Sequence, residues 1–485
     1  MKTRLTVGIV LLALSGVALA VVQRNGWTLW YGDAEAHLAI ARRVIDSRTP
    51  GWDQIGTVWL PFPHVLMLPL VWSERLFRTG LAGAIPSAIG FVLSGWFLFL
   101  TGLRVFQCKA SSLAAVGVVA SNPNLLYLQA TPMTEPVMFA ALTALLYATV
   151  VFRELGSFRY AALAGVASVA ASLTRYEGWF LIPFVFCYFL IVAPRRSGVA
   201  ALLFGAIACV GPLYWLAHNW WYFGDALSFY RGPYGPRAIQ GDKPYPGLHN
   251  WGEAWLYYRS AIGLVMGMRA CVLGAAGIAV ALWKRIWWPV LFLVLPPAFY
   301  LWSMESSGGS PIFIPTLWPH SYYNTRYGLA ALPLLAFGAG ALVLIGRARW
   351  RPYMAAAVVV GSVVLHSVCW KESEVNSVAR RAWTHQSAEY LQQHYAHGTG
   401  IFAALGDQAG VFREAGIPFR DVLQEGNGPA WLGAVGKPNL LLNEGWALAI
   451  EGDAVWRTVS SDPRYVLEKS ITVPGAPAVE IYRLN

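Results

Sequence analysis

The residues best suited to chemistry stand together, directly after the first apolar segment of the chain. The stretch Tyr31-Gly-Asp-Ala-Glu-Ala-His37 places two carboxyl groups and one imidazole within seven residues. Acidic side chains beside a lipid bilayer are costly to desolvate, so they usually have a partner or a function there. Asp33 is the candidate general base, because a carboxylate can take a proton from a hydroxyl group. Glu35 is a second candidate catalytic acid.

Asp33 also has a simpler interpretation as the N-cap of a helix that begins at Ala34. We favour a catalytic role, because further ionisable residues are expected near Asp33 on the outer side of the membrane. One of them is Glu135, in the connection Gln129-Ala-Thr-Pro-Met-Thr-Glu-Pro136. Glu135 is therefore the third candidate catalytic acid.

A divalent metal is a further possibility. Asp33 and His37 are four residues apart and would share one face of a helix. With Glu135 they would offer a metal two carboxylates and one imidazole. A lone histidine among aromatic residues is more often only hydrogen-bonded, so the sequence requires no cofactor. The five cysteines show no CxxC and no metal spacing, and they indicate no disulfide framework.

The composition places the chain in a membrane. Of its 485 residues, 56% are hydrophobic and only 13% are charged. A soluble protein of this length would carry about a quarter charged residues. The elements that position the candidate residues are therefore expected to be membrane-spanning helices.

Eleven apolar segments approach the length of a spanning helix, about 17–25 residues. With a cytoplasmic N-terminus, the cytoplasmic connections hold thirteen basic residues and one acid, Glu154. This distribution follows the positive-inside rule. The net charge of +11 is thereby explained by topology and needs no nucleic-acid partner. The segments are approximately residues 5–22, 83–103, 111–127, 136–152, 160–173, 179–193, 198–217, 261–283, 287–303, 328–346 and 353–370.

Two domains are expected, a transmembrane domain over 1–370 and a small α/β domain over 371–485 on the outer face. The transmembrane domain would include an outer catalytic loop, 23–82, that holds the acidic stretch. Residues 1–20 also fit a cleaved signal peptide, but the apolar run continues through Val22 and favours a retained first helix. The sequence thus predicts a multi-pass protein of the cytoplasmic membrane.

The layout and several short motifs resemble a known family. In the first loop, Asp33 is followed four positions later by His37 and about two turns later by Ala41-Arg42. A Pro-rich element, Leu60-Pro-Phe-Pro-His64, comes before the next apolar segment. These features resemble the GT-C superfamily of membrane glycosyltransferases. Within it, the chain is most similar to the protein O-mannosyltransferase and lipid A aminoarabinose transferase group.

Other positions match that group or depart from it. A second acid near the turn between the third and fourth helices is usual in the group, and Glu135 stands there. Many members carry a second acid directly after the aspartate, where this chain has Ala34. They also carry an aromatic residue where this chain has His37. These departures leave the sugar and any metal dependence open.

The resemblance implies that the chain moves a sugar from a polyprenyl-phosphate donor to a glycan, lipid or protein acceptor. The reaction would take place on the outer side of the membrane. Asp33, Glu35 and Glu135 are the acids that the resemblance and the sequence offer for catalysis. Arg42, which matches the arginine of the group, and His64 are expected beside the phosphate of the donor.

Two further arginines are candidates for the donor phosphate. They lie in Thr174-Arg-Tyr176 and Thr325-Arg-Tyr327, each at the expected outer end of an apolar segment. The guanidinium group of Arg175 or Arg326 can bind two oxygens of a phosphate at once. Alternatively, both side chains reach the interface and pair with nearby acids, Glu177 or Glu305.

A transporter or flippase of lipid-linked sugars is the alternative function. It would share the apolar bulk and a basic cavity with an enzyme. Transporters usually place polar residues near the bilayer midplane, in interrupted helices and often in repeats. The apolar segments of this chain read as uninterrupted, and its polar residues lie in the outer loops. The sequence therefore favours an enzyme.

Overall fold

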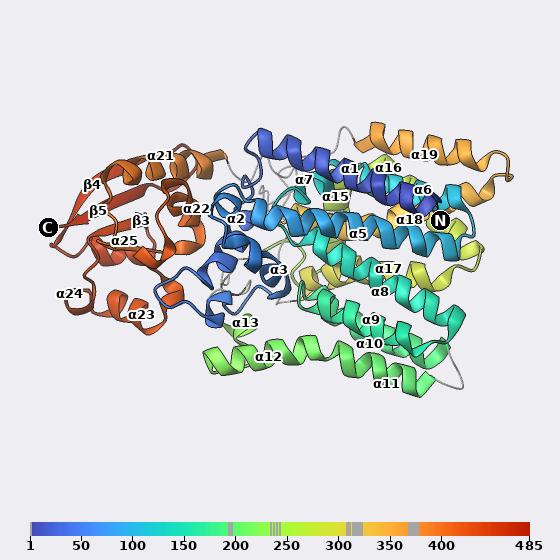
Figure 1. The fold of residues 1–485 in the computed structure, drawn as a ribbon, viewed down its shortest axis with the longest axis horizontal. Coiled ribbons are helices and arrows are strands. Elements are labelled where there is room, and N and C mark those ends of the chain that lie inside the picture. The colour runs from blue at the N-terminus through green and yellow to red at the C-terminus, as the bar shows by residue number, and fades with distance from the viewer. Residues whose placement is uncertain are drawn as a thin grey trace. The chain divides into compact units, whose positions relative to one another are not determined.

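The computed structural model describes residues 2–192, 197–232, 235, 238, 241, 244–306, 312, 324–366 and 378–485. The chain forms two compact units (Figure 1). Unit 1 comprises Met1–Asn25, Thr57–Pro63 and Ala84–Glu372. Unit 2 comprises Gly26–Gly56, His64–Gly83 and Ser373–Asn485.

Unit 1 is built from helices, as its apolar composition predicts, and most of them lie side by side (Figure 1). Two short 3-10 helices, η2 (Thr325–Ala331) and η3 (Val343–Ile345), flank the helix α18. The α-helices are α1 (Lys2–Arg24), α5 (Leu81–Val105), α6 (Lys109–Ala120), α7 (Pro123–Leu128), α8 (Glu135–Leu155), α9 (Phe158–Ser172), α10 (Glu177–Val192), α11 (Ser197–Ala208), α12 (Val210–Phe223), α13 (Ser228–Arg231), α15 (Trp251–Met266), α16 (Met268–Trp283), α17 (Trp287–Glu305), α18 (Leu332–Leu342) and α19 (Arg351–His366).

Fewer helices than expected are long enough to cross a membrane. Among the described residues, six helices are long and apolar enough, and a bent pair raises the number to seven. The eleven expected spans are therefore not confirmed, although the helices do indicate a multi-pass membrane protein. Shorter helices replace several expected spans, and the end of the expected segment 353–370 lies outside the described residues. The six are Lys2–Arg24, Leu81–Val105, Glu135–Leu155, Gly198–Phe223, Trp287–Glu305 and Thr325–Ile345.

One expected span is shortened by a capped break. The apolar segment 111–127 is divided between α6 and α7, because the side chain of Asn122 caps a new helix by accepting from the Leu125 N–H. Pro123 occupies the first position of α7, where a missing N–H costs nothing. Hydropathy alone does not register such a break.

The expected span 261–283 is also interrupted. Helices α15 and α16 are bent by 104° at Gly267, whose φ of 82° favours glycine. A helix end leaves carbonyl groups without partners in the helix. Here the side-chain amides of Asn122 and Asn124 donate to the Val265 carbonyl at 2.9 and 3.0 Å. The expectation of uninterrupted helices is wrong at this point.

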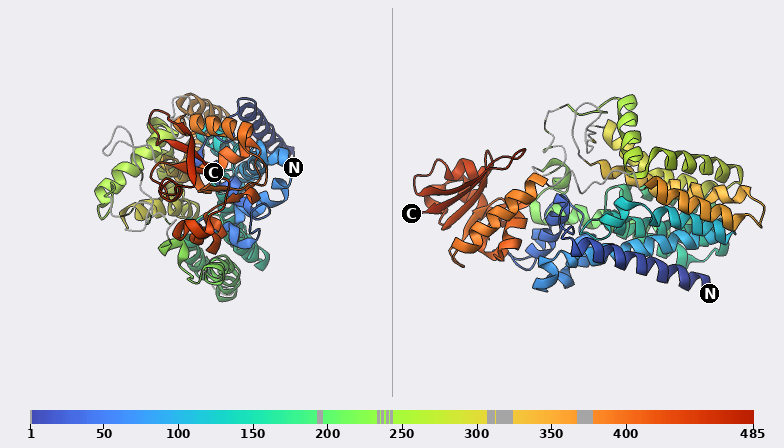
Figure 2. Two further views of the ribbon diagram at one scale, coloured as in Figure 1. Left: turned by 90° about the vertical axis from the view of Figure 1, so that its left-hand side faces the viewer. Right: turned by 90° about the horizontal axis from the view of Figure 1, so that it is seen from above.

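Unit 2 is an α/β structure around a five-stranded sheet of order β2-β1-β3-β5-β4. Strand β1 pairs in parallel with β2 and β3, and β5 pairs antiparallel with β3 and β4. Figure 2 shows the strands together with the helices of the same unit. The strands are β1 (Ile401–Ala403), β2 (Val422–Leu423), β3 (Trp446–Ile450), β4 (Tyr465–Ile471) and β5 (Val479–Leu484).

Helices cover both faces of this sheet. Alternate residues of β1 belong to different cores, since Ile401 packs with α21 (Val378–His394) and α22 (Leu405–Ala415), and Phe402 with the helices after β2. Those helices are α23 (Pro429–Gly436) and α25 (Ala454–Val459). A further short helix, α24 (Pro438–Leu441), and two short 3-10 helices, η4 (Phe419–Asp421) and η5 (Glu425–Asn427), complete the unit.

The first loop contributes a layer of unit 2. It forms α2 (Gly32–Arg43), η1 (Trp52–Ile55), α3 (Phe62–Val71) and α4 (Glu74–Arg78). Most of this loop, expected in the transmembrane domain as 23–82, instead shares a core with Ser373–Asn485. The expected boundary between 370 and 371 lies outside the described residues. The physical reason is burial, because Leu38, Met67, Val71 and Phe77 pack against Trp383, Leu391, Phe412 and Phe419.

Candidate functional site

Unit 1 contains a buried network of two acids and two arginines. Glu135 Oε1 accepts hydrogen bonds from Arg175 Nη1 at 3.1 Å and from Arg326 Nε at 2.8 Å. Arg175 Nε also donates to Glu177 Oε1 at 2.8 Å. The Tyr300 hydroxyl donates to that same Glu177 oxygen at 2.7 Å and accepts from Arg175 Nη2 at 2.6 Å. Opposite charges in equal number offset the cost of burying this network.

Helix ends position the acids. Glu135 opens α8 and is followed by Pro136, and Glu177 opens α10. Carboxylates are stabilised in the first turn of a helix by the aligned backbone N–H groups. Arg175 lies in the turn between α9 and α10 and also donates to the Thr134 hydroxyl at 2.9 Å. The network thus ties the starts of two helices together.

Aromatic rings enclose the arginines. The rings of Tyr300 and Tyr327 stack with centroids 4.7 Å apart. The guanidinium carbons of Arg175 and Arg326 each lie 5.3 Å from the centre of the Tyr327 ring. Rings that exclude water lower the local dielectric, which strengthens every ionic interaction within the network.

One buried carboxylate oxygen of the network has no hydrogen-bond partner among the described residues. Among the described residues, Glu135 Oε2 is buried and has no hydrogen-bond partner, and the same holds for the hydroxyl of Thr325. A buried acceptor without a partner costs about 1–3 kcal/mol. A ligand that donates a hydrogen bond to Glu135 Oε2 would recover this free energy.

The sequence identifies part of this network. It indicates Glu135, Arg175 and Arg326 as candidates. It also indicates Glu177 as an alternative partner of Arg175, and the structure confirms that ion pair. The repeated Thr-Arg-Tyr motif already contains Tyr327. Tyr300 is missed, because a tyrosine inside an apolar helix gives no distinguishing signal. Whether Arg175 and Arg326 bind the donor phosphate stays a prediction.

In unit 2, Asp33 lies in the first turn of α2 and is half-buried. The N-cap of α2 is Tyr31, and no side chain caps this helix. The interpretation of Asp33 as the N-cap is therefore wrong, because the helix begins at Gly32 and not at Ala34. The catalytic role of Asp33 stays a prediction.

Glu35 is engaged by a buried arginine. Its two oxygens accept from Arg413 Nε at 2.7 Å and from Arg413 Nη2 at 3.1 Å. Burial opposes the charged form of Arg413, but the carboxylate of Glu35 outweighs it and raises the pKa of Arg413. This ion pair fastens α2 to α22, so Glu35 has a structural role whether or not it also takes part in catalysis.

Two buried histidines of unit 2 form a pair. His37 Nδ1 lies 3.0 Å from His64 Nε2. A hydrogen bond between two ring nitrogens requires one of them to be unprotonated. Within the described part of the chain, no three His, Cys, Asp or Glu side chains group as a metal site requires. The predicted metal site consists of Asp33 and His37, which belong to unit 2, and Glu135, which belongs to unit 1. The described residues give this predicted site no support.

All three guanidinium nitrogens of Arg42 donate hydrogen bonds. Nε donates to Asp46 at 3.0 Å, Nη1 to the Val71 carbonyl at 2.7 Å, and Nη2 to Glu74 at 3.0 Å. The guanidinium carbon also lies 4.7 Å from the centre of the Phe77 ring. Arg42 therefore links α2 to α3 and α4, and its binding of the donor phosphate, like that of His64, stays a prediction.

Comparisons with known proteins agree with the resemblance predicted from the sequence. Residues 73–220 match the family model of the dolichyl-phosphate-mannose-protein mannosyltransferases. Together with the fold matches below, this confirms the resemblance to the GT-C glycosyltransferases. No curated protein sequence matches the chain.

Solved structures of other proteins share the fold of this chain. The chain is similar to ArnT from Cupriavidus metallidurans bound to undecaprenyl phosphate, with a TM-score of 0.60 and 14% identity. That match covers 96% of this chain and 97% of the other. It is also similar to the apo form of the Archaeoglobus fulgidus oligosaccharyltransferase, with a TM-score of 0.52 and 13% identity. The second match covers 92% of this chain and 69% of the other.

Proposed function

We propose that this protein transfers a sugar from a polyprenyl-phosphate donor to a glycan, lipid or protein acceptor. The observation that carries the proposal is the fold match over 96% of the chain to ArnT, which was solved with undecaprenyl phosphate bound. The family match over 73–220 supports the same class of donor. The buried arginines of unit 1 supply the type of charge that a phosphate needs.

In the proposed reaction, Asp33 takes the proton from the acceptor hydroxyl, because an alcohol is a poor nucleophile at neutral pH. The acceptor oxygen forms a bond to the anomeric carbon of the sugar. The bond between that carbon and the phosphate oxygen breaks, and the phosphate leaves with the electron pair. A single displacement of this kind inverts the configuration of the anomeric centre.

Arg175 and Arg326 are proposed to stabilise the departing phosphate, since guanidinium groups can bind its oxygens in pairs. Both already bind Glu135 Oε1, which fixes the orientation of their side chains. Such preorganisation lowers the cost of reorganising the site during the reaction. Glu135 is thus proposed as a catalytic-site acid that acts through the two arginines.

The reaction is proposed to take place on the outer side of the cytoplasmic membrane. The support is the distribution of charge, because the loops expected in the cytoplasm hold thirteen basic residues and one acid. Residues 371–485 would then lie on the outer side and are proposed to shape access of the acceptor. Labelling of a cysteine introduced into unit 2, in intact cells and with a reagent that does not cross membranes, tests this orientation.

The function is tested with the purified full-length protein and a panel of polyprenyl-phosphate sugars. We expect release of polyprenyl phosphate that depends on an added acceptor. The Asp33→Asn variant serves as the matched control for background hydrolysis. A protein that neither binds nor turns over any donor of the panel would contradict the proposal.

One observation favours the alternative, a transporter of lipid-linked sugars. The pair α15 and α16 is bent by 104°, and broken helices are common in transporters. Protein reconstituted into vesicles distinguishes the two functions. A transporter would move labelled donor between the leaflets without acceptor and without cleaving it, whereas the proposed enzyme would cleave it.

A further inference from the structure

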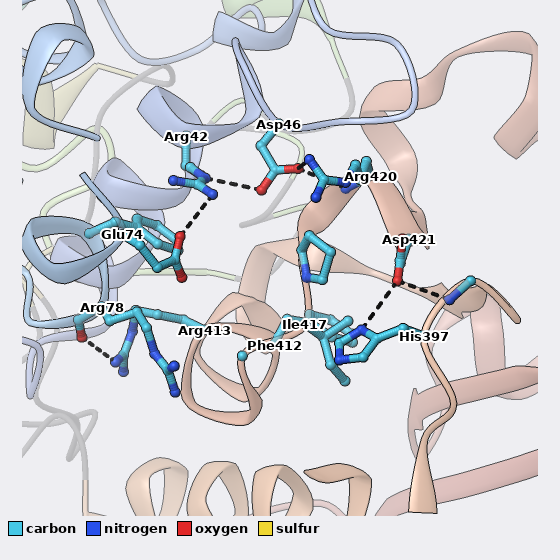
Figure 3. A pocket seen from close by; sticks show the side chains of 14 residues that line it. Arg42, Asp46, Glu74, Arg78, His397, Phe412, Arg413, Ile417, Arg420 and Asp421 are labelled. Atoms are coloured by element: carbon cyan, nitrogen blue, oxygen red, sulfur yellow. Dashed lines mark hydrogen bonds and ion pairs between the residues drawn. The ribbon is translucent and has the colours of Figure 1, made fainter. Parts of the chain in front are cut away.

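Unit 2 contains a pocket of about 620 Å³ (Figure 3). Phe77, Phe412 and Ile417 also line it, although all three are almost fully buried. Its charged lining consists of four arginines, three acids and a histidine: Arg42, Arg78, Arg413, Arg420, Asp46, Glu74, Asp421 and His397. Such a mixed lining is typical of sites that hold a small ligand by a few oriented polar groups.

The carboxylates of this lining already accept hydrogen bonds from the protein. Asp46 Oδ2 accepts from Arg42 Nε at 3.0 Å, and Oδ1 accepts from the Arg420 backbone N–H at 3.3 Å. Asp421 Oδ2 accepts from the Tyr395 hydroxyl at 3.0 Å. Burial, together with the charge of Asp421, raises the pKa of Tyr395 to about 12, which keeps this donor protonated.

Arg78 and Arg420, at the rim of the pocket, have N–H groups available for further hydrogen bonds. Each guanidinium group carries five N–H donors. In the described structure, Arg78 uses its guanidinium for one bond, from Nη2 to the Glu414 carbonyl at 3.0 Å. The nearest carboxylate oxygen to Arg420 is that of Asp46 at 4.0 Å, and the Arg420 side chain is 69% exposed. His397 is 70% exposed and lies 3.7 Å from Asp421.

The pocket therefore offers donors in excess of acceptors. Glu74 is the most exposed carboxylate of the lining, and its Oε2 accepts from Arg42 Nη2 at 3.0 Å. A neutral sugar, whose hydroxyl groups both donate and accept, would therefore find fewer acceptors than donors here. An oxyanion only accepts, and its oxygens match the planar fork of a guanidinium group. Figure 3 shows that Arg78 and Arg420 come from different elements of unit 2, α4 and η4, so a ligand between them would be held from two directions.

We propose that this pocket binds the phosphate group of a phosphate monoester through Arg78, Arg420 and His397. The rest of the ligand lies against the small apolar surface of Phe77 and Ile417. Two sources share this chemistry, a sugar phosphate and the headgroup of an anionic lipid. The binding site lies wholly within unit 2 and does not depend on the proposed transfer reaction.

The test measures ligand binding to the full-length protein in detergent by isothermal titration calorimetry. Its probes are inorganic phosphate, glucose 1-phosphate and glucose. We expect saturable binding of both phosphate compounds, weakened by added salt, and none of glucose. Each of Arg78→Gln and Arg420→Gln should weaken binding by about tenfold or more, because each removes charge-assisted hydrogen bonds.

The control variant is Arg457→Gln, which changes an exposed arginine of α25 that does not line the pocket. It should bind both phosphate compounds as the unchanged protein does. Arg78 and Arg420 are both exposed, so their variants should fold, and equal thermal unfolding midpoints check this. Absence of saturable phosphate binding, or equal affinity in all three variants, would overturn the proposal.

Two further arms of the experiment distinguish the sources. Tighter binding of glucose 1-phosphate than of inorganic phosphate identifies a sugar phosphate as the ligand. Competition by nanodiscs with phosphatidic acid, but not by nanodiscs with phosphatidylcholine alone, identifies a lipid headgroup. Asp33→Asn should lower sugar transfer by about 10²–10⁴-fold and leave phosphate binding unchanged, so failure of the proposed function and failure of this site give different results.

Discussion

At the scale of single residues, the two acids of α2 stand in different environments. Glu35 is 5% exposed and gives both oxygens to one arginine, so its charge is needed for an ion pair. Asp33 is half-buried two positions earlier in the same helix. Because both oxygens of Glu35 bind Arg413, they are less accessible to an acceptor hydroxyl. Asp33 therefore stays the proposed base, and Glu35 has a structural ion pair.

Asp33→Asn tests this assignment. Asparagine keeps the size and hydrogen-bonding shape of aspartate but cannot accept the proton of the acceptor. Turnover should fall by about 10²–10⁴-fold, the range ascribed to general-base catalysis. Donor affinity should change little, because the carboxylate is proposed to act on the acceptor. Initial rates and donor binding are both measured, and near-normal turnover would end the case for Asp33.

Glu35→Gln tests the ion pair that fastens α2 to α22. Removing one partner of a buried pair leaves an uncompensated charge and costs about 3–5 kcal/mol. The cost should lie toward the lower end, because Arg413 Nη2 also donates to Glu414 at 3.2 Å. Denaturant unfolding of the purified protein measures this change in the free energy of unfolding.

A double-substitution cycle supplies the control for this prediction. The variant Arg413→Met should also be destabilised, since it leaves the charge of Glu35 buried. The protein with both substitutions should be more stable than the sum of the two losses predicts. Strict additivity would show that Glu35 and Arg413 do not stabilise each other.

At the scale of elements, close helix packing in unit 1 depends on glycine. A Cβ atom at Gly277 of α16 would overlap the backbone carbonyl of Gly338 in α18. Backbone atoms cannot move aside as a flexible side chain can, so Gly277→Ala should cost about 1–3 kcal/mol or more. Gly361 of α19 has no atom within 4 Å of such a Cβ, and Gly361→Ala is the matched control.

Thermal unfolding of both variants in detergent measures this difference. Gly361→Ala should leave the midpoint unchanged or raise it slightly, because alanine loses less backbone entropy on folding than glycine. Gly277→Ala should lower the midpoint clearly. Equal midpoints for the two variants would mean that α16 and α18 do not approach as closely as described.

At the scale of the whole molecule, the sequence predicts the fold class and the family resemblance better than it predicts where helices and strands begin and end. Apolar runs locate most of the helices of unit 1, because burial in lipid requires continuous hydrophobicity. The break at Gly267 escapes notice, since a single glycine inside an apolar run is common. The strand β3 is missed because all but the last of its five residues are buried and show no alternation.

The sequence predicts only part of the candidate site, because many of its contacts join residues that are far apart in the chain. Short motifs identify Glu135, Arg175 and Arg326 by residue type, but pairing across long sequence separations is a property of the fold. The partnership of Glu35 with Arg413 joins residues 378 positions apart, and no local pattern announces it. The same holds for the first loop, whose apolar faces pack against a part of the chain that follows hundreds of residues later.

This long-range packing leads to a prediction for unit 2 as a whole. Leu38, Met67, Val71 and Phe77 of the first loop are each at most 5% exposed in the core that they share with α22 and the sheet. Burying one such side chain contributes about 1.5–3 kcal/mol. Four together contribute about 6–12 kcal/mol, which is comparable to the whole free energy of unfolding of a typical domain, about 5–15 kcal/mol.

Residues 373–485 expressed alone should therefore fail to fold cooperatively. A matched chain in which residues 26–83 precede 373–485 through a flexible glycine-serine linker should recover a cooperative thermal transition. Circular dichroism in the near ultraviolet follows the packing of Trp383 and Trp446, which are both buried in the shared core. If 373–485 alone unfolds as cooperatively as the linked chain and at the same temperature, the first loop does not stabilise unit 2.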